Sequence, residues 1–325
     1  MAMGVIFEAM RESRVFADLT PRDRDGRLVA LTVPVGLLAA VVAALLGAAS
    51  ACLIVMVVVS GLDGAPAAAA LFAVFDDPAR ASSEGVSSLF LLSVLAGANG
   101  AAALAFVGVA GGLMHRAIRR YAFPGPLFRT RLTVAGLSAV GVVMGVVVLA
   151  GWLLGAKPPS PPVLDLASTT FGRATYVGFA VVLLVLAAAA EEVVFRGWLL
   201  KQTGALTRNP AILMVFNGLL FATIHFDPNL SAFLVRAAMG AGLTWMTLRT
   251  GGIELAIGAH AANNIVILML LRPLSIQPEA AQPFEAGSLV SAVAIAVSYA
   301  GLAEAVVRWP AMTGWIGGRG DPAPV

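Results

Sequence analysis

The sequence predicts an all-α protein whose helices form a polytopic transmembrane bundle. Of its 325 residues, 59% are hydrophobic and only 12% are charged, and the mean hydropathy is +0.90. An ordinary soluble domain has about 25% charged residues, whereas one membrane-spanning helix needs about 20 apolar residues in succession. This composition excludes a soluble globular enzyme and a disordered chain.

Long apolar runs bounded by charged residues, proline or glycine predict about eight spans. These runs cover residues 28–60, 88–114, 132–155, 174–200, 210–226, 231–248, 253–271 and 286–306. The charged segment 1–27 lacks the pattern of a cleavable signal peptide. The chain is therefore expected to have a cytoplasmic N-terminal segment (1–27), a transmembrane helical domain (28–306) and a cytoplasmic tail (307–325).

The distribution of Lys and Arg predicts the orientation. Segments on the N-terminal side of the spans hold 15 of these residues, the opposite side holds four, and Arg196 and Arg236 lie inside spans. Because cytoplasmic loops are enriched in Lys and Arg, both termini are expected in the cytoplasm and the protein in the cell membrane. The balance of 21 basic against 18 acidic residues is too slight to indicate nucleic acid, and the single Cys52 excludes an intrachain disulfide. Membrane lipids are the expected surroundings.

Ionisable side chains are costly inside a membrane, so each one within a span is a candidate functional residue. Here the polar and motif-forming residues of the spans gather in the second half of the chain. They are Glu191, Glu192 and Arg196 in the fourth span, Asn217, Phe221 and His225 in the fifth, Arg236 in the sixth, and His260, Asn263 and Asn264 in the seventh.

Helical spacing arranges these residues in pairs. Glu192 and Arg196 are four residues apart, in the order that favours an ion pair on one helix face. Glu191 projects away from Arg196, so one carboxylate is neutralised and its neighbour stays available. Phe221 with His225, and His260 with Asn264, repeat the four-residue spacing and present two stripes to a shared interior.

These residues form the patterns EExxxR on the fourth span, FxxxH on the fifth and HxxxN on the seventh, which together resemble the three motifs of the CPBP family. That family includes type II CAAX prenyl proteases and bacterial abortive-infection membrane proteins. The resemblance covers residues 172–271, the expected protease core. It implies an intramembrane endopeptidase that hydrolyses a membrane-associated or lipidated, CAAX-like protein or peptide.

Peptide hydrolysis needs an activated water and donors for the oxyanion. Glu191, desolvated and unpaired, is expected to act as the general base, and His225 to hold the same water. His260 and Asn264 are expected to face the developing oxyanion, which matches the roles that the resemblance implies. Glu192 and Arg196 would support the site structurally, and Phe221 would form a cavity wall.

A zinc mechanism is the main alternative chemistry. Glu191, His225 and His260 would make a His₂Glu set with an open fourth position. There is no HExxH helix, and Asn264 has a clearer role without a metal, so the sequence favours a metal-independent glutamate mechanism; the cofactor is either none or Zn²⁺.

Other functions also stay open. Polar residues of this kind also occur in helix packing, in ion-coupled transporters and in non-catalytic immunity or scaffold proteins, but six residues that match three motifs favour hydrolysis. A transporter is disfavoured because two similar halves with broken helices are missing.

The depth of the site raises a difficulty. At about 1.5 Å per residue, Glu191 lies about 13 Å from a helix end near Leu200, but His225 lies about 22 Å from Pro210. The fifth helix is therefore expected to begin below the membrane surface or to run obliquely.

Overall fold

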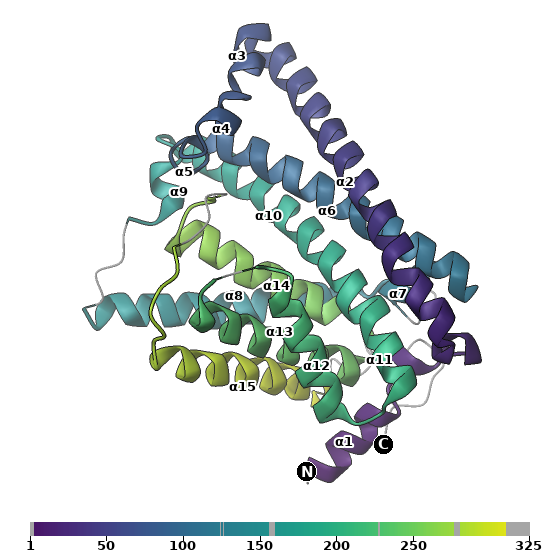
Figure 1. Ribbon diagram of the computed structural model, residues 1–325. Coiled ribbons are helices and arrows are strands. Elements are labelled where there is room, and N and C mark those ends of the chain that lie inside the picture. Colours follow the sequence, from purple (N-terminus) through teal and green to yellow (C-terminus); the bar gives the residue numbers. More distant parts are fainter. Residues whose placement is uncertain are drawn as a thin grey trace.

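The structure is a computed structural model, and it describes residues 3–123, 125, 127–155, 160–226, 228–275 and 280–309. Within these residues the regular elements are helices, without strands, which confirms the predicted all-α class (Figure 1). Most of the expected C-terminal tail, residues 310–325, lies outside the described residues.

A helix forms over each of the eight predicted spans. These helices are α2 (Gly26–Asp63), α6 (Gly85–Met114), α8 (Thr130–Leu153), α10 (Thr170–Glu192) continued by η3 (Val193–Leu199) and α11 (Leu200–Leu206), α12 (Pro210–Thr223), α13 (Leu230–Thr250), α14 (Glu254–Val266) continued by η4 (Ile267–Leu271), and α15 (Gly287–Arg308). Six of these eight are long and apolar enough to cross a membrane. The remaining two are α12, which has only 14 residues, and the more polar α13. The chain is an integral membrane protein.

Short helices occupy the ends and connections. They are α1 (Met3–Arg11), η1 (Arg14–Phe16), η2 (Pro21–Arg24), α3 (Ala65–Ala70), α4 (Ala73–Asp76), α5 (Arg80–Ser83), α7 (Arg119–Ala122) and α9 (Pro162–Asp165). In Figure 1, α3, α4, α5 and α9 lie at one end of the long helices, and α1 lies toward the other.

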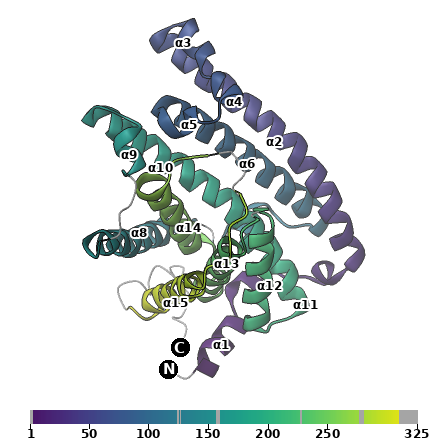
Figure 2. The same ribbon diagram turned by 60° about the vertical axis from the view of Figure 1, so that its left-hand side comes forward.

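Helix α14 occupies the centre of the fold. It packs against α8, α10 and α13, and nearly all of its residues are buried. Helices α2 and α6 pack together on one flank, and α13 and α15 pack together on the other (Figures 1 and 2). Polar residues on α14 therefore face protein rather than lipid, which is the environment that such residues need in a membrane.

Two glycine contacts bring the site-bearing helices close together. A Cβ atom at Gly218 of α12 would lie 2.5 Å from the carbonyl oxygen of Ala237 on α13. One at Gly240 of α13 would lie 2.9 Å from the Cα of Gly218. The absence of side chains at both positions lets the two backbones touch, as small residues do at membrane helix crossings.

Hydrogen bonds and ion pairs hold the N-terminal segment against one end of the helix bundle. Asp23 accepts hydrogen bonds from Arg116 at 2.8 and 2.9 Å and from Gln202 at 3.2 Å. Asp18 pairs with Arg116 and with Lys201. Although burial alone would raise the pKa of the Asp23 carboxyl, the hydrogen bonds from Arg116 hold this pKa below its ordinary value. The segment thus joins the ends of α6 and α11.

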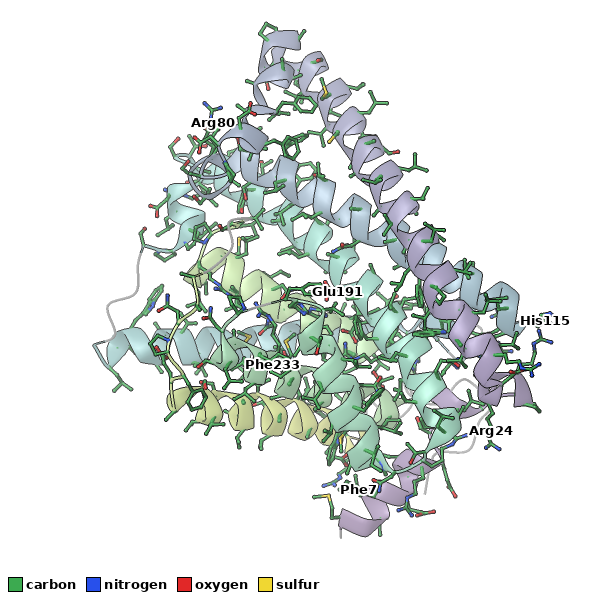
Figure 3. All side chains as sticks on the ribbon, viewed as in Figure 1. Phe7, Arg24, Arg80, His115, Glu191 and Phe233 are labelled. Carbon is green, nitrogen blue, oxygen red and sulfur yellow. The ribbon has the colours of Figure 1, made fainter. Side chains whose placement is uncertain are left out.

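The basic segments gather at that same end. Arg22 donates to the carbonyl of Leu113, and Arg24 donates to that of Ala205. In Figure 3, Arg24, His115 and Phe7 lie toward this end, and Arg80 lies at the opposite one. This grouping agrees with the arrangement of loops that the eight-span topology requires. That this end faces the cytoplasm stays a prediction.

Candidate active site

Glu191 and Glu192 are the last residues of α10, where the chain passes into the π-helical segment η3. Local π-helical turns are frequent at functional sites. Arg196, inside η3, donates from Nη1 to Oε1 of Glu192 at 2.9 Å and from Nη2 to the carbonyl oxygen of Gly240 at 2.9 Å. Both side chains of the pair are completely buried. The predicted Glu192–Arg196 ion pair is confirmed, and it also ties α10 to α13.

His260 lies between the two glutamates. Its Nδ1 atom is 2.8 Å from Oε1 of Glu192, and its Nε2 atom is 3.7 Å from Oε2 of Glu191. A carboxylate only accepts hydrogen bonds, so Nδ1 carries a proton and donates to Glu192. His260 is nearly fully buried. Glu192 therefore holds the imidazole of His260 as well as the guanidinium of Arg196, a contact that helical periodicity could not reveal.

His225 follows the end of α12 rather than lying within the helix. The backbone N–H of His225 donates to the carbonyl oxygen of Ala222 at 3.2 Å. Its ring atom Nδ1 lies 2.8 Å from the carbonyl oxygen of Phe221. Phe226, which comes next, has a left-handed φ of 48° and turns the chain away. His225 is thus the exposed tip of a helix that ends at the site.

Phe221 has a more central position than the expected cavity wall. It is fully buried, and its ring centroid lies 4.9 Å from that of His225 and 5.5 Å from that of His260. The guanidinium carbon of Arg196 lies 4.6 Å from the same centroid. Phe221 therefore packs against the buried arginine and against both histidines.

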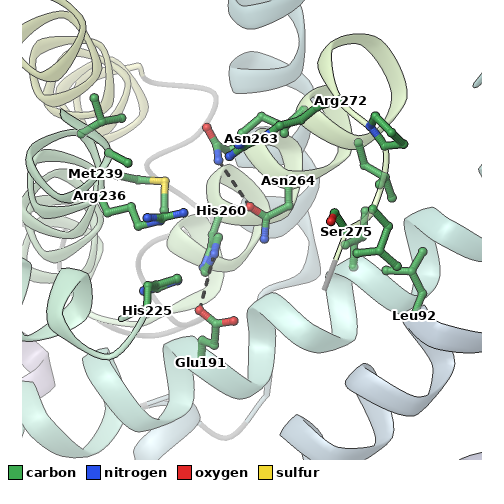
Figure 4. Close-up of a pocket in the computed structure, with 17 residues that line it drawn as sticks. Leu92, Glu191, His225, Arg236, Met239, His260, Asn263, Asn264, Arg272 and Ser275 are labelled. Atoms are coloured by element: carbon green, nitrogen blue, oxygen red, sulfur yellow. Dashed lines mark hydrogen bonds and ion pairs between the residues drawn. The ribbon is translucent and has the colours of Figure 1, made fainter. Parts of the chain in front are cut away.

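A polar cavity of about 460 Å³ opens onto these residues (Figure 4). Glu191, His225, His260 and Asn264 all line it, so the structure brings the four predicted catalytic residues to one space. Asn263 donates from Nδ2 to Oδ1 of Asn264 at 3.3 Å. Because the Asn264 oxygen accepts this bond, the amide nitrogen of Asn264 is the atom that can donate into the cavity.

A second, largely apolar cavity of about 600 Å³ shares the lining residues Glu191 and His225 with the first. It is bounded by α2, α6, the α10–η3 segment and α12. Its wall includes Leu37, Phe106 and Trp198 among other apolar side chains. Glu191 consequently borders both a largely apolar cavity and a polar one.

Whether a zinc ion would fit depends on how the candidate ligand side chains are placed. In the part of the chain that the structure describes, no group of three or more His, Cys, Asp and Glu residues is placed to hold a metal ion. The Nδ1 atom of His260 contacts Glu192, and its Nε2 atom faces Glu191 at 3.7 Å. Glu191, His225 and His260 do not form the His₂Glu set considered from the sequence.

The depth difficulty arises because the fourth helix is longer than expected. It continues through η3 and α11 to Leu206, beyond the predicted end near Leu200. Glu191 then lies about 22 Å from the helix end, the same distance that separates His225 from Pro210. His260 still lies only about 12 Å from Gly252 by the same count, so the expectation of a sunken or oblique fifth helix stays a prediction.

Sequence reasoning assigned no role to three other residues that line the polar cavity. Arg236, Asn263 and Arg272 all face it. The first two were noticed as polar residues within spans, whereas Arg272 falls just beyond a predicted span and gave no signal.

The fold and the site define a helical membrane protein with a buried glutamate, histidine and asparagine cluster. The model of the Type II CAAX prenyl endopeptidase Rce1-like family matches residues 173–266. This match confirms, over that range, the resemblance that the three motifs indicated.

One relative extends the comparison. The chain is 40% identical over 98 residues to the uncharacterized protein YyaK of Bacillus subtilis (strain 168), a match that covers 28% of this chain and 33% of that protein. The chain thus matches about a third of this relative's length. No solved structure matches the chain.

Proposed function

We propose that this protein is an intramembrane endopeptidase that hydrolyses a peptide bond in a membrane-associated or lipidated, CAAX-like protein or peptide. The observation that carries the proposal is the position of Glu191. Its Oε2 atom is buried without a hydrogen-bond partner among the described residues, and its side chain is 23% exposed and lines both cavities. The family match over residues 173–266 supports the same activity.

In the proposed reaction, Glu191 takes a proton from a water that His225 helps to hold. The hydroxide attacks the substrate carbonyl carbon, and the negative charge develops on the carbonyl oxygen. Protonated Glu191 then gives its proton to the leaving nitrogen as the carbon–nitrogen bond breaks. The reaction consumes one water and needs no metal.

His260 and Asn264 would stabilise the oxyanion. His260 would donate from Nδ1 to Glu192, which orients the ring, and present Nε2 toward the reacting oxygen, beside the Asn264 amide. Preorganised donors of this kind are among the largest contributions to catalysis.

The apolar cavity would take the lipid part of the substrate. A space of about 600 Å³ falls within the range of small-molecule sites. A chain lying there and a peptide lying in the polar cavity would both meet Glu191. The substrate would then be drawn from the membrane, and the cut would occur near the lipidated residue.

The test is cleavage of a prenylated CAAX-type peptide by the purified protein in lipid nanodiscs, in water enriched in ¹⁸O. The expected result is one ¹⁸O atom in the new carboxylate, detected by mass spectrometry. Glu191→Gln should abolish this product, and the exposed-site control Glu8→Gln should retain it. If ion flux into proteoliposomes occurs without cleavage, the transporter alternative is correct; if neither occurs, a scaffold or immunity role is favoured.

A further inference from the structure

A cavity of about 340 Å³ lies at the basic end of the bundle and shares no lining residue with the two cavities at Glu191. The N-terminal segment forms one side of it, through η1, η2 and the residues between them, and the connection from α11 to α12 forms the other. Arg24 and Arg208 are the charged residues among the described side chains that line it. The cavity is therefore positively charged.

Each arginine is held by a contact that leaves donors unused. Arg24 donates from Nε to the carbonyl oxygen of Ala205 at 3.0 Å, and its two Nη atoms make no hydrogen bond to the described residues. The guanidinium carbon of Arg208 lies 4.2 Å from the ring centroid of Phe16. Stacking on an aromatic ring fixes the plane of a guanidinium group and leaves the N–H groups at its edge available.

The two positive charges have no carboxylate as an ion-pair partner among the described residues. Asp18 and Asp23, on the same segment, pair with basic residues of α11 and of the chain after α6. The Asp25 side chain accepts from the backbone at the start of α2. Burial and the nearby charge of Arg24 lower the pKa of the Arg208 guanidinium. A bound anion would relieve this repulsion between like charges.

The cavity lies at the level expected for lipid headgroups. Exposed apolar side chains on α12 follow the spacing of one lipid-facing stripe, at Ile212, Val215, Phe216 and Leu219. Arg208 precedes the first of them by four residues, about 6 Å at the helical rise. The headgroup layer on each side of a bilayer is about 5 to 7 Å thick. A phosphate at Arg208 and an acyl chain beside α12 are thus compatible with one lipid molecule.

We infer that Arg24 and Arg208 bind the phosphate group of an anionic phospholipid. Guanidinium groups bind phosphate through paired, charge-assisted hydrogen bonds, and basic pockets of membrane proteins hold acidic headgroups. A zwitterionic headgroup would bring its own cation toward two arginines, so an anionic headgroup is favoured. The bound lipid joins the N-terminal segment to the connection between the helix that carries Glu191 and the helix that ends at His225. This site is independent of the proposed peptidase function.

The test is a titration of the delipidated protein with phosphatidylglycerol, followed by native mass spectrometry. Arg24→Gln and Arg208→Gln should each raise the dissociation constant about tenfold, because each removes charge-assisted hydrogen bonds. Arg27→Gln is the matched control and should bind as the unaltered protein does, since it removes an exposed arginine of the same end that does not line the cavity. Phosphatidylcholine should bind more weakly to the unaltered protein.

Melting in nanodiscs separates lost binding from lost folding. Adding phosphatidylglycerol to phosphatidylcholine should raise the melting temperature of the unaltered protein and of Arg27→Gln, and this rise should be lost in Arg24→Gln and Arg208→Gln. If a glutamine variant already melts lower in phosphatidylcholine alone, Arg208→Lys decides, because it keeps the positive charge beside Phe16. This variant should retain only part of the rise.

Three results would overturn the inference. The first is an unchanged affinity for phosphatidylglycerol in both glutamine variants. The second is an equal loss of affinity in Arg27→Gln, which would indicate general attraction between a basic surface and an acidic lipid. The third is a rise in melting temperature with inorganic phosphate that equals the rise with phosphatidylglycerol, which would make the ligand a free phosphate rather than a lipid.

Discussion

The Nδ1 atom of His260 lies 2.8 Å from Oε1 of Glu192, the same oxygen that accepts from Arg196 at 2.9 Å. One buried carboxylate oxygen thus orients a candidate catalytic histidine on α14 and neutralises an arginine on η3. The adjacent Glu191 contacts the other side of the same imidazole at 3.7 Å. This arrangement supports the proposal that Glu192 positions His260 and that Glu191 is the base.

Removing either member of the buried ion pair should destabilise the protein. Glu192→Gln and Arg196→Gln each leave an uncompensated charge where both side chains are fully buried, at a cost of about 3 to 5 kcal/mol. Thermal melting of the purified variants should show this loss together with reduced expression. A fully stable Glu192→Gln protein would contradict it.

Glu191→Gln should behave in the opposite way. The carboxylate makes no hydrogen bond through its buried Oε2 atom among the described residues, so its removal should leave the melting temperature unchanged or higher. Cleavage should be abolished because the water loses its base. If Glu191→Gln stays active while Glu192→Gln is inactive yet stable, the two roles are reversed.

Asn264→Ala should act on the transition state. Loss of one oxyanion donor costs about 10²- to 10³-fold in kcat, and KM should hardly change because the ground-state carbonyl is held elsewhere. Steady-state kinetics on the peptide of the cleavage assay measures both constants. A rise in KM at constant kcat would make Asn264 a binding residue instead.

Metal removal should leave cleavage intact. The His, Cys, Asp and Glu side chains of the described residues do not form a three-residue metal set. Dialysis against a chelator followed by elemental analysis and the same assay tests this. Loss of activity that zinc restores, with zinc binding absent in His225→Ala and His260→Ala, would establish the metal mechanism.

The N-terminal attachment should weaken in acid. Arg116 keeps the pKa of Asp23 below its ordinary value of 3.8, so the pair stabilises the fold fully above that pH and loses its effect as the pH falls further. Asp23→Asn should lower stability by about 2 kcal/mol at neutral pH, and this difference should shrink below about pH 4. Melting curves of both proteins across this pH range give the comparison. A difference independent of pH would show that the Asp23 charge is unimportant.

Cysteine labelling tests the orientation. In a Cys52→Ala background, a cysteine at Ala117 should react only from the cytoplasmic side and one at Ser82 only from outside, because the basic segments gather at the Ala117 end. Reaction of the Ala117 position with an external reagent would invert the topology.

Much of the fold followed from the sequence because its determinants are local. Apolar runs of about 20 residues locate membrane helices whatever surrounds them, and helical spacing alone predicted the Glu192–Arg196 pair that the structure confirms. The same spacing selected Glu191, His225, His260 and Asn264, which the structure places around one cavity.

The tertiary structure decided what depends on helix ends and on contacts between distant segments. His260 and Glu192 are 68 positions apart, and their contact depends on how α14 sits against α10, which no single helix encodes. The continuation of the fourth helix to Leu206 through a π-helical segment has no simple residue pattern, yet it places Glu191 as many residues from the end of its helix as His225 is from Pro210. Arg272 lines the cavity from the extended backbone that follows η4. Helical periodicity says nothing about a residue beyond the end of a helix, so the sequence pattern could not place it.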